Sequence, residues 1–297
     1  MAKNLEVDRI DLADTGQPRK LAELLVEQLR PQLPSLLPIP IEEVALACGI
    51  LDIQELQTEG FDGGLIQNPE KTQGFILVKV GSRTDRRRFT IGHELGHFLN
   101  PYHHSPPGDG RFLCTGEHLR ASGKPGNNRL GLEAQANEFA AHLLMPQQFL
   151  RSDSKLWGSP EIRSVLDLQS LCQVSKEAAA RRFIELHGDP CAIVFSRDGK
   201  VRYCVHGGGF PSIAVTSNSV LGRRTLTSRF KGEPGDVSPQ EDAETHEWLR
   251  DSDARYWEVW EEVLVQQDGF RMTLLLGEKG DREEDEELEE RWKPRFR

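Results

Sequence analysis

The chain has 297 residues, with 37 Lys and Arg against 47 Asp and Glu, which gives a formal net charge of −10. This length allows two ordinary domains, and 37% hydrophobic with 28% charged residues is typical of a globular protein. The acidic balance argues against a protein that coats nucleic acid. The block from Asp281 to Glu290 contains eight acidic residues and one Arg, so it predicts a solvated acidic tail.

The sequence shows neither a membrane segment nor an export signal. No stretch approaches the roughly 18 apolar residues of a membrane helix, and the first residues are charged, without the apolar centre of a signal peptide. The five cysteines are an odd number and include no CxxC pair. This pattern favours buried thiols in a reducing compartment over a disulfide framework or a cysteine-built zinc site. We therefore predict a cytoplasmic protein with no membrane partner.

The front part of the chain predicts helices around a small sheet. Apolar residues at helical spacing, together with capping and breaking residues, predict helices over 18–29, 41–48, 85–100 and 132–144. Asp85 is the expected N-cap of the third of these helices. Alternating apolar residues predict strands over 61–66 and 74–80, and the segment 101–128, which is rich in Pro, Gly and Ser, is expected to be a loop or insertion.

The second part of the chain changes from helical to strand patterns. Residues 160–186 predict two helices with a break near Gln173, similar to a helix-turn-helix, with Ser175 as the N-cap of the second helix. Strands are expected over 191–195, 201–205, 256–265 and 270–276, with a hairpin turn at 267–269. The predicted fold is α+β: a mainly helical domain with a small antiparallel sheet (1–158), a helix-turn-helix-like segment (159–189), a smaller β-rich C-terminal domain (190–277) and the acidic tail (278–297).

Residues 93–97 form the pattern HExxH. Residues four apart lie on the same face of a helix, so the imidazoles of His93 and His97 can bind one Zn²⁺, while Glu94 can act as general base toward water activated by the ion. The motif lies within a predicted helix that follows a predicted strand, which is the context that this chemistry requires. Mn²⁺ or Fe²⁺ also suits a site with two histidines and one carboxylate, although HExxH favours zinc.

A catalytic zinc usually has three protein ligands and one open position, and two residues compete for the third place. Glu133, in the downstream helix, can present a carboxylate, with Asn137 four residues further on and able to orient a ligand histidine. His103 is the alternative, because it completes the spacing HExxHxxNxxH, one residue away from the metzincin pattern HExxHxxGxxH. Spacing alone leaves both ligands open.

Two motifs together resemble those of the ImmA/IrrE family of bacterial metallopeptidases. They are Arg88-Phe89-Thr90-x-x-His93-Glu94-x-x-His97 and Glu133-x-x-Ala136-Asn137-x-Phe139-Ala140-x-x-Leu143-Leu144-Met145-Pro146. The resemblance covers about residues 37–186, and it implies a gluzincin-like site in which His93, His97 and Glu133 hold zinc and Glu94 is the catalytic acid and base. It also implies an endopeptidase of restricted specificity that cleaves a helix-turn-helix transcriptional repressor or an antitoxin, in a stress, mobile-element or defence response.

The linker between His97 and Glu133 is longer than is usual for this family, which leaves several polar side chains near the site. These are Tyr102, His103, His104 and His118. Peptide hydrolysis normally needs a second electrophile for the oxyanion, and the candidates are Tyr102, His104 and His142. The strand over 74–80 is the expected shelf for substrate, because an exposed sheet edge can pair with an extended peptide.

The helix-turn-helix-like segment also supports an alternative interpretation. The chain could be a non-proteolytic regulator that binds protein or DNA through residues 168–186 and uses zinc structurally. Lys176, Arg181 and Arg182 could contact phosphates. Three cations are few for a net-acidic chain, so the sequence argues against direct nucleic-acid binding.

Overall fold

The computed structural model describes residues 5–33, 35, 37–104, 111–114, 128–151 and 156–280. His118 and the acidic block 281–290 lie outside these residues. The chain divides into two compact units, Met1–Asp153 with Leu168–Ala178, and Ser154–Asp167 with Ala179–Arg297. Within the described residues, no helix combines the length and the apolar character needed to cross a membrane.

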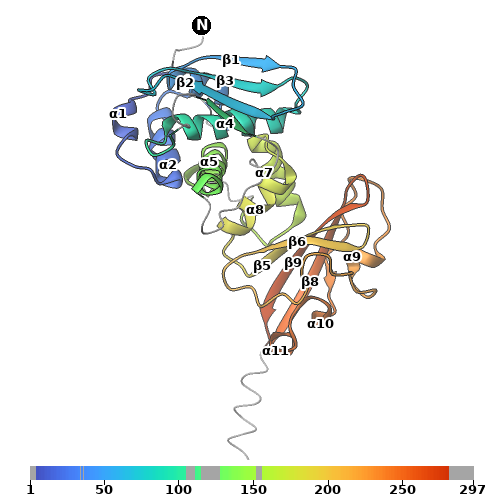
Figure 1. Cartoon of the computed structure of the whole chain (residues 1–297). Helices are drawn as coiled ribbons and strands as arrows, with labels where there is room; N and C mark the ends of the chain where they lie inside the picture. Colours follow the sequence, from blue (N-terminus) through green and yellow to red (C-terminus); the bar gives the residue numbers. More distant parts are fainter. Residues whose placement is uncertain are drawn as a thin grey trace, which may run out of the picture. The chain divides into compact units, whose positions relative to one another are not determined.

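The first unit contains a four-stranded sheet and the helices packed on it (Figure 1). Its elements are α1 (Arg9–Leu12), α2 (Pro18–Leu29), α3 (Ile41–Ala47), β1 (Ile50–Leu56), β2 (Gly63–Gln67), β3 (Gly74–Lys79), α4 (Thr84–Leu99), β4 (Arg111–Cys114), α5 (Asn128–Leu144) and α6 (Gln147–Leu150). The four helices and two strands predicted for this part of the chain are confirmed to within a few residues. Helices α7 (Ile162–Cys172) and α8 (Lys176–Leu186) follow, and the break between them falls at Gln173, as predicted.

The strand order in this sheet is β1-β3-β2-β4. Strand β3 pairs parallel with β1 and antiparallel with β2, and β2 pairs antiparallel with β4. The sheet is therefore antiparallel except for β1, a strand that the sequence analysis did not predict. Because β3 is hydrogen-bonded on both sides, the prediction that residues 74–80 offer an exposed edge to a peptide is wrong.

Helix α4 begins at Thr84, with Arg83 at the cap position and no side-chain cap. The predicted N-cap, Asp85, lies inside the first turn instead, and its carboxylate is 3.2 Å from the guanidinium of Arg83. That prediction is wrong by two residues, because the helical backbone already begins after Arg83, whose own φ of −59° and ψ of 150° are non-helical.

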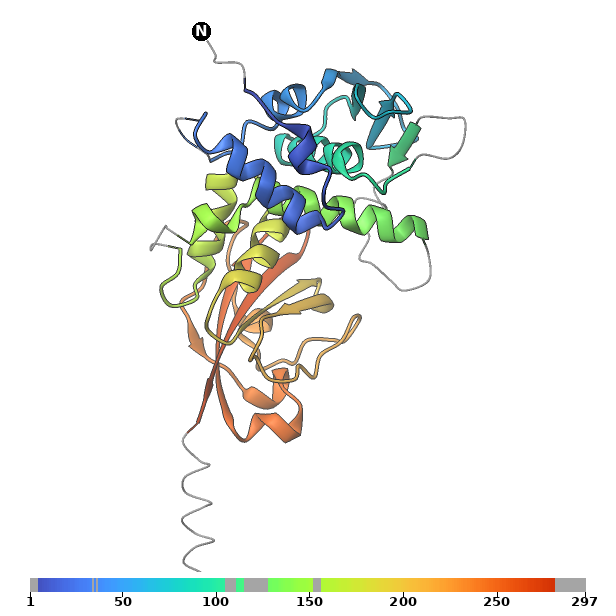
Figure 2. The same ribbon diagram turned by 90° about the vertical axis from the view of Figure 1, so that its left-hand side faces the viewer.

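Helix α4 packs against α5, and α2 lies along the same helix α5 (Figure 2). The contact between α4 and α5 is close because α4 presents glycine there. A Cβ atom on Gly96 would lie 2.9 Å from Cδ1 of Phe139, and one on Gly92 would lie 3.3 Å from Cβ of Ala140. The two glycines thus let α5 approach the HExxH helix closely.

Replacing each of the two glycines by alanine should change the stability of the protein to a different extent. We expect Gly96→Ala to lower the free energy of unfolding by about 1–3 kcal/mol, because the added methyl group overpacks the contact with Phe139. Gly92→Ala should be close to neutral, since the gain in helix propensity of about 1 kcal/mol offsets a milder contact. Urea unfolding of both variants measures the difference. A Gly96→Ala protein as stable as the wild type would show that the helices do not need this close approach.

The second unit is built on a five-stranded antiparallel sheet in the order β6-β5-β9-β8-β7. Its elements are β5 (Cys191–Arg197), β6 (Lys200–His206), α9 (Leu226–Arg229), β7 (Glu241–Asp242), α10 (Thr245–Trp248), α11 (Asp251–Ala254), β8 (Trp257–Val265) and β9 (Phe270–Lys279). One face of this sheet packs on a core that includes the fully buried Trp248. The four predicted strands are confirmed, as is the hairpin turn, where Asp268 and Gly269 have positive φ angles of 54° and 73°. The α+β fold with a β-rich C-terminal part is confirmed, and the exact domain boundaries stay a prediction.

Candidate metal centre

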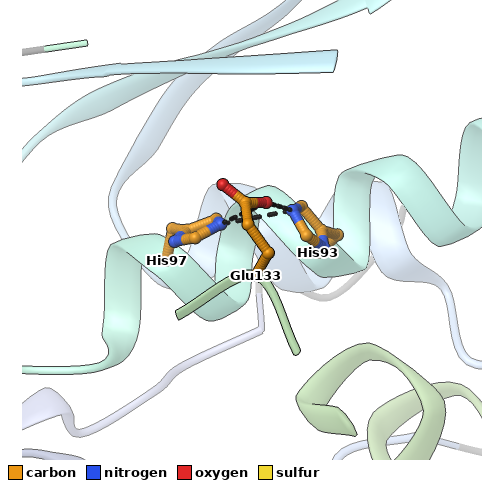
Figure 3. Close-up of side chains that lie close together, drawn as sticks. All are labelled: His93, His97 and Glu133. Carbon is orange, nitrogen blue, oxygen red and sulfur yellow. Dashed lines mark hydrogen bonds and ion pairs between the residues drawn. The ribbon is translucent and has the colours of Figure 1, made fainter. Parts of the chain in front are cut away.

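Helices α4 and α5 bring three potential ligands together (Figure 3). Nε2 of His93 lies 3.2 Å from Nε2 of His97 and 3.2 Å from Oε2 of Glu133. Nε2 of His97 lies 3.5 Å from the same carboxylate oxygen. All three side chains are buried. In Figure 3, the carboxylate of Glu133 lies between the imidazole rings of His93 and His97.

These separations suit a divalent ion in tetrahedral geometry. Bonds of about 2.0–2.1 Å from the ion to nitrogen or oxygen place neighbouring ligand atoms about 3.3–3.4 Å apart. The three measured separations, 3.2, 3.2 and 3.5 Å, lie around this value. Two imidazoles and one carboxylate form the donor set of many catalytic metal sites, in which a fourth position stays open to solvent or substrate. The residues therefore fit a divalent metal ion.

The hydrogen bonds behind the rings determine where their protons lie. Nδ1 of His93 lies 2.8 Å from Oδ1 of Asn137, and an amide oxygen can only accept, so His93 donates from Nδ1. Nδ1 of His97 lies 2.9 Å from Nδ1 of His103, whose Nε2 lies 2.9 Å from Oε1 of Gln135. By the same logic His103 donates from Nε2 and accepts at Nδ1 from His97. Both ligand histidines then present an unprotonated Nε2 to the carboxylate.

The protonation states are those that metal binding requires. Burial lowers the pKa of His97 to about 3, although the contact with Glu133 opposes this shift, and burial lowers the pKa of His103 to about 4. At neutral pH the rings of His97 and His103 are therefore neutral, and a cation held by His93, His97 and Glu133 would keep the carboxylate charged. Because bare nitrogen atoms face this carboxylate, a cation is the group that best balances it.

Glu94 follows His93 on α4 and is fully buried beside the first residue of β2. A Cβ atom on Gly63 would lie 2.8 Å from Oε1 of Glu94 and would also collide with Thr90. Only glycine at this position leaves room for the Glu94 carboxylate. The sequence analysis assigned no role to Gly63, and the Gly-Gly pair at the start of the strand was the only available signal.

The other predicted site residues lie at three different places. His103 is buried on the Nδ1 side of His97, away from the Nε2 atoms that meet Glu133. Tyr102 and His104 are exposed and line a cavity of about 710 Å³ that is bordered by residues of α5, including Gln135. His142 lies nine residues beyond Glu133 on α5, which is about 13 Å along the helix axis.

Lys71 is a contributor that the sequence analysis missed. It lies in the turn between β2 and β3, and its Nζ donates to the carbonyl oxygens of His97, Asn100 and His103 at 2.8, 2.6 and 3.1 Å. The ammonium group thus closes the C-terminal end of α4, where carbonyl groups lack partners within the helix. Burial lowers the pKa of Lys71 to about 8. The guanidinium of Arg9 donates to the carbonyl of Lys71 at 2.6 Å and so holds this turn in place.

An HExxH helix packed against a second helix that supplies a carboxylate is the arrangement found in many metal-dependent hydrolases. Residues 50–183 match the model of the peptidase M78 family, which is described as the IrrE N-terminal-like domain. The resemblance to the ImmA/IrrE family, which the two motifs indicated, is confirmed over this segment of the chain. The matched segment contains the three potential ligands and Glu94.

A solved structure described as a Mycobacterium tuberculosis transcriptional regulator is similar to this chain, with a TM-score of 0.50 and 12% identity. The similarity covers 91% of this chain and 79% of that chain, and it supports the fold alone. Among curated proteins, no sequence matches this chain significantly.

Proposed function

We propose that this chain is a zinc-dependent endopeptidase of restricted specificity that acts in the cytoplasm. The observation that carries the proposal is the convergence of His93, His97 and Glu133 at the separations of a tetrahedral ion, with Glu94 adjacent. The match of residues 50–183 to a peptidase family model supports a peptide bond as the group attacked. A cytoplasmic location is supported by the buried or half-buried thiols of Cys48, Cys191 and Cys204, which form no disulfide within the part of the chain that the structure describes.

The residues divide the chemistry between them. When bound, the ion supplies a Lewis acid that polarises a carbonyl group and increases the acidity of water. Glu94 takes the proton from water and later gives it to the leaving amine. Asn137 keeps the ring of His93 in the orientation that exposes its Nε2. Tyr102 and His104, which line the neighbouring cavity, are better placed for contact with a bound peptide than His142.

The proposed substrate is a helix-turn-helix transcriptional repressor or an antitoxin. This proposal rests on the resemblance of the two motifs to those of the ImmA/IrrE family, because that resemblance implies such a substrate. Cleavage would then release genes of a stress, mobile-element or defence response from repression.

Metal-dependent cleavage in a complex mixture of proteins tests the proposal. The purified chain, loaded with Zn²⁺ or stripped with a chelator, is added to an extract of source cells that lack the gene, and new protein N-termini are identified by mass spectrometry. We expect new N-termini in one or a few proteins, only with the loaded chain, and with a helix-turn-helix protein among them. If a chain that binds Zn²⁺ stoichiometrically creates none in extracts of resting or stressed cells, the peptidase proposal fails.

A second candidate is a regulator that acts through α7 and α8. Oγ of Ser175 accepts from the N–H of Ala178 at 3.1 Å and so caps α8 directly after the left-handed Gln173, which is the local geometry of a helix-turn-helix. The similar solved structure is described as a transcriptional regulator. Against direct DNA contact, Arg182 is buried and its guanidinium lies 2.7 Å from Glu185. A double variant, Lys176→Ala with Arg181→Ala, tests this candidate. If the variant still binds DNA, α8 is not the DNA contact. If the variant loses DNA binding and the wild-type chain cleaves no protein, the regulator is favoured.

A further inference from the structure

The two ligand histidines reach α5 in different ways. Behind His93, the Nδ1–H donates directly to the amide oxygen of Asn137, at 2.8 Å. Behind His97, a second imidazole intervenes: Nδ1 of His103 lies 2.9 Å from Nδ1 of His97, and Nε2 of His103 lies 2.9 Å from Oε1 of Gln135. Both series of hydrogen bonds end on a side-chain amide oxygen of α5, that of Asn137 or that of Gln135.

The geometry of α5 explains this difference. Residues four apart share a helix face, so Asn137 and Glu133 both point toward α4. Gln135 lies two residues from Glu133 and therefore about 200° around the helix. Its amide cannot replace Asn137 behind a ligand ring, and His103 spans the gap between Gln135 and His97.

Gln135, the last residue in the series His97–His103–Gln135, determines the direction of these hydrogen bonds. Oε1 of Gln135 can only accept, so the single N–H of a neutral His103 ring is on Nε2. Nδ1 of His103 then accepts, and the single N–H of His97 must be on Nδ1. The amide oxygen of Gln135 thus determines, through two rings, that Nε2 of His97 carries a lone pair toward Glu133.

We propose that His103 and Gln135 are positioning residues that fix the tautomer and orientation of His97 for metal binding. This inference rests on the proposed function, because it assigns His103 to the same metal centre. His103 is suited to this role, since it is fully buried and both of its ring nitrogens are engaged. Its backbone is held as well, because Lys71 donates to its carbonyl oxygen at 3.1 Å while also binding the end of α4.

Loss of the acceptor at position 103 has a defined consequence. In a His103→Leu variant, the buried Nδ1–H of His97 loses its acceptor at Nδ1 of His103, which is unfavourable for a buried donor. The ring can avoid this cost by moving its proton to Nε2 and donating to Glu133, and that tautomer cannot bind a metal ion through Nε2. Partners of this type typically contribute 10–100-fold to metal affinity.

Two substitutions at position 103 separate positioning from packing. We expect His103→Leu to weaken Zn²⁺ binding about 10–100-fold, measured by competition with a chromophoric chelator. His103→Asn should stay within about threefold of the wild type, because Oδ1 of asparagine occupies nearly the place of Nδ1 and can accept from His97. Gln135→Leu should also weaken Zn²⁺ binding, and it replaces His103→Leu in the test if that variant does not fold. The exposed His206→Leu, in the second unit, is the matched control and should bind as the wild type does.

The visible absorption spectrum of bound Co²⁺ gives a second measurement. The positioning role predicts an unchanged spectrum in His103→Asn, since the ligand atoms stay the same. A changed spectrum with equal weakening in His103→Leu and His103→Asn would identify His103 as a direct ligand and overturn the inference. Unchanged Zn²⁺ affinity in both His103→Leu and Gln135→Leu would overturn it while leaving the proposed function intact. If the wild-type chain binds no divalent metal, the proposed function fails and the inference fails with it.

Discussion

The Glu94→Gln variant is expected to cleave peptide about 10²–10⁴-fold more slowly than the wild type, which is the usual contribution of a general acid and base. Glutamine keeps the shape of the side chain in the space that Gly63 leaves open, but it cannot take a proton from water. Metal affinity should change by no more than a few-fold, because Glu94 is not among the three ligand residues. Initial rates of cleavage and Zn²⁺ stoichiometry, measured on the same preparation, check both expectations.

Glu138→Gln is the matched control for this variant. Glu138 lies on α5 and is exposed, so the same chemical change there should leave cleavage intact. If Glu94→Gln cleaves at the wild-type rate, the base is another residue. If it loses its metal together with its activity, the loss cannot be assigned to proton transfer.

The HExxH helix could be predicted because its information is local. His93 and His97 are four residues apart, so the period of the helix alone places both imidazoles on one face. The helix that carries Glu133 could also be predicted from its local sequence pattern. Its contact with α4 was not, because the close approach depends on Gly92 and Gly96 meeting side chains more than 40 positions away.

The missed features depend on contacts between distant parts of the chain. Strand β1 has mostly exposed residues, so it lacks the alternation that indicates a half-buried strand. Once β1 pairs with β3, the strand at 74–80 has no exposed edge. Lys71 reaches carbonyl groups 26 to 32 residues further along the chain, and no local pattern indicates such a contact.

His103 shows how far spacing can be taken. The spacing HExxHxxNxxH allows three imidazoles to approach one ion, and His103 does come to the centre. The chain after α4 turns at Asn100, whose carbonyl accepts from the N–H of His103 at 3.2 Å, and this turn brings His103 to Nδ1 of His97. The spacing in the sequence thus predicted that His103 lies near the metal centre. It did not predict that His103 contacts Nδ1 of His97, because this contact depends on the turn at Asn100 and on Lys71.

The Glu133→Gln variant is expected to separate metal binding from the stability of the metal-free fold. The carboxylate of Glu133 is buried, charged and faced by two bare nitrogen atoms, an arrangement that favours a cation. The amide of glutamine is neutral and can donate N–H groups to those nitrogen atoms. We therefore expect Zn²⁺ affinity to fall more than about 100-fold, with no loss, and even a gain, in the free energy of unfolding of the metal-free protein.

Thermal unfolding with and without Zn²⁺ measures both effects at once. Free Zn²⁺ at 100 times its dissociation constant should stabilise the wild type by about 2.7 kcal/mol and raise its Tm, whereas Glu133→Gln should show almost no shift at the same concentration. Glu138→Gln, on the same helix, should respond as the wild type does. Because burial lowers the pKa of the ligand His97 to about 3, its ring stays unprotonated and the wild-type response should persist as the pH falls toward 5. A Glu133→Gln protein that Zn²⁺ stabilises normally would show that the ion is bound without this carboxylate, and the proposed centre would have to be redrawn.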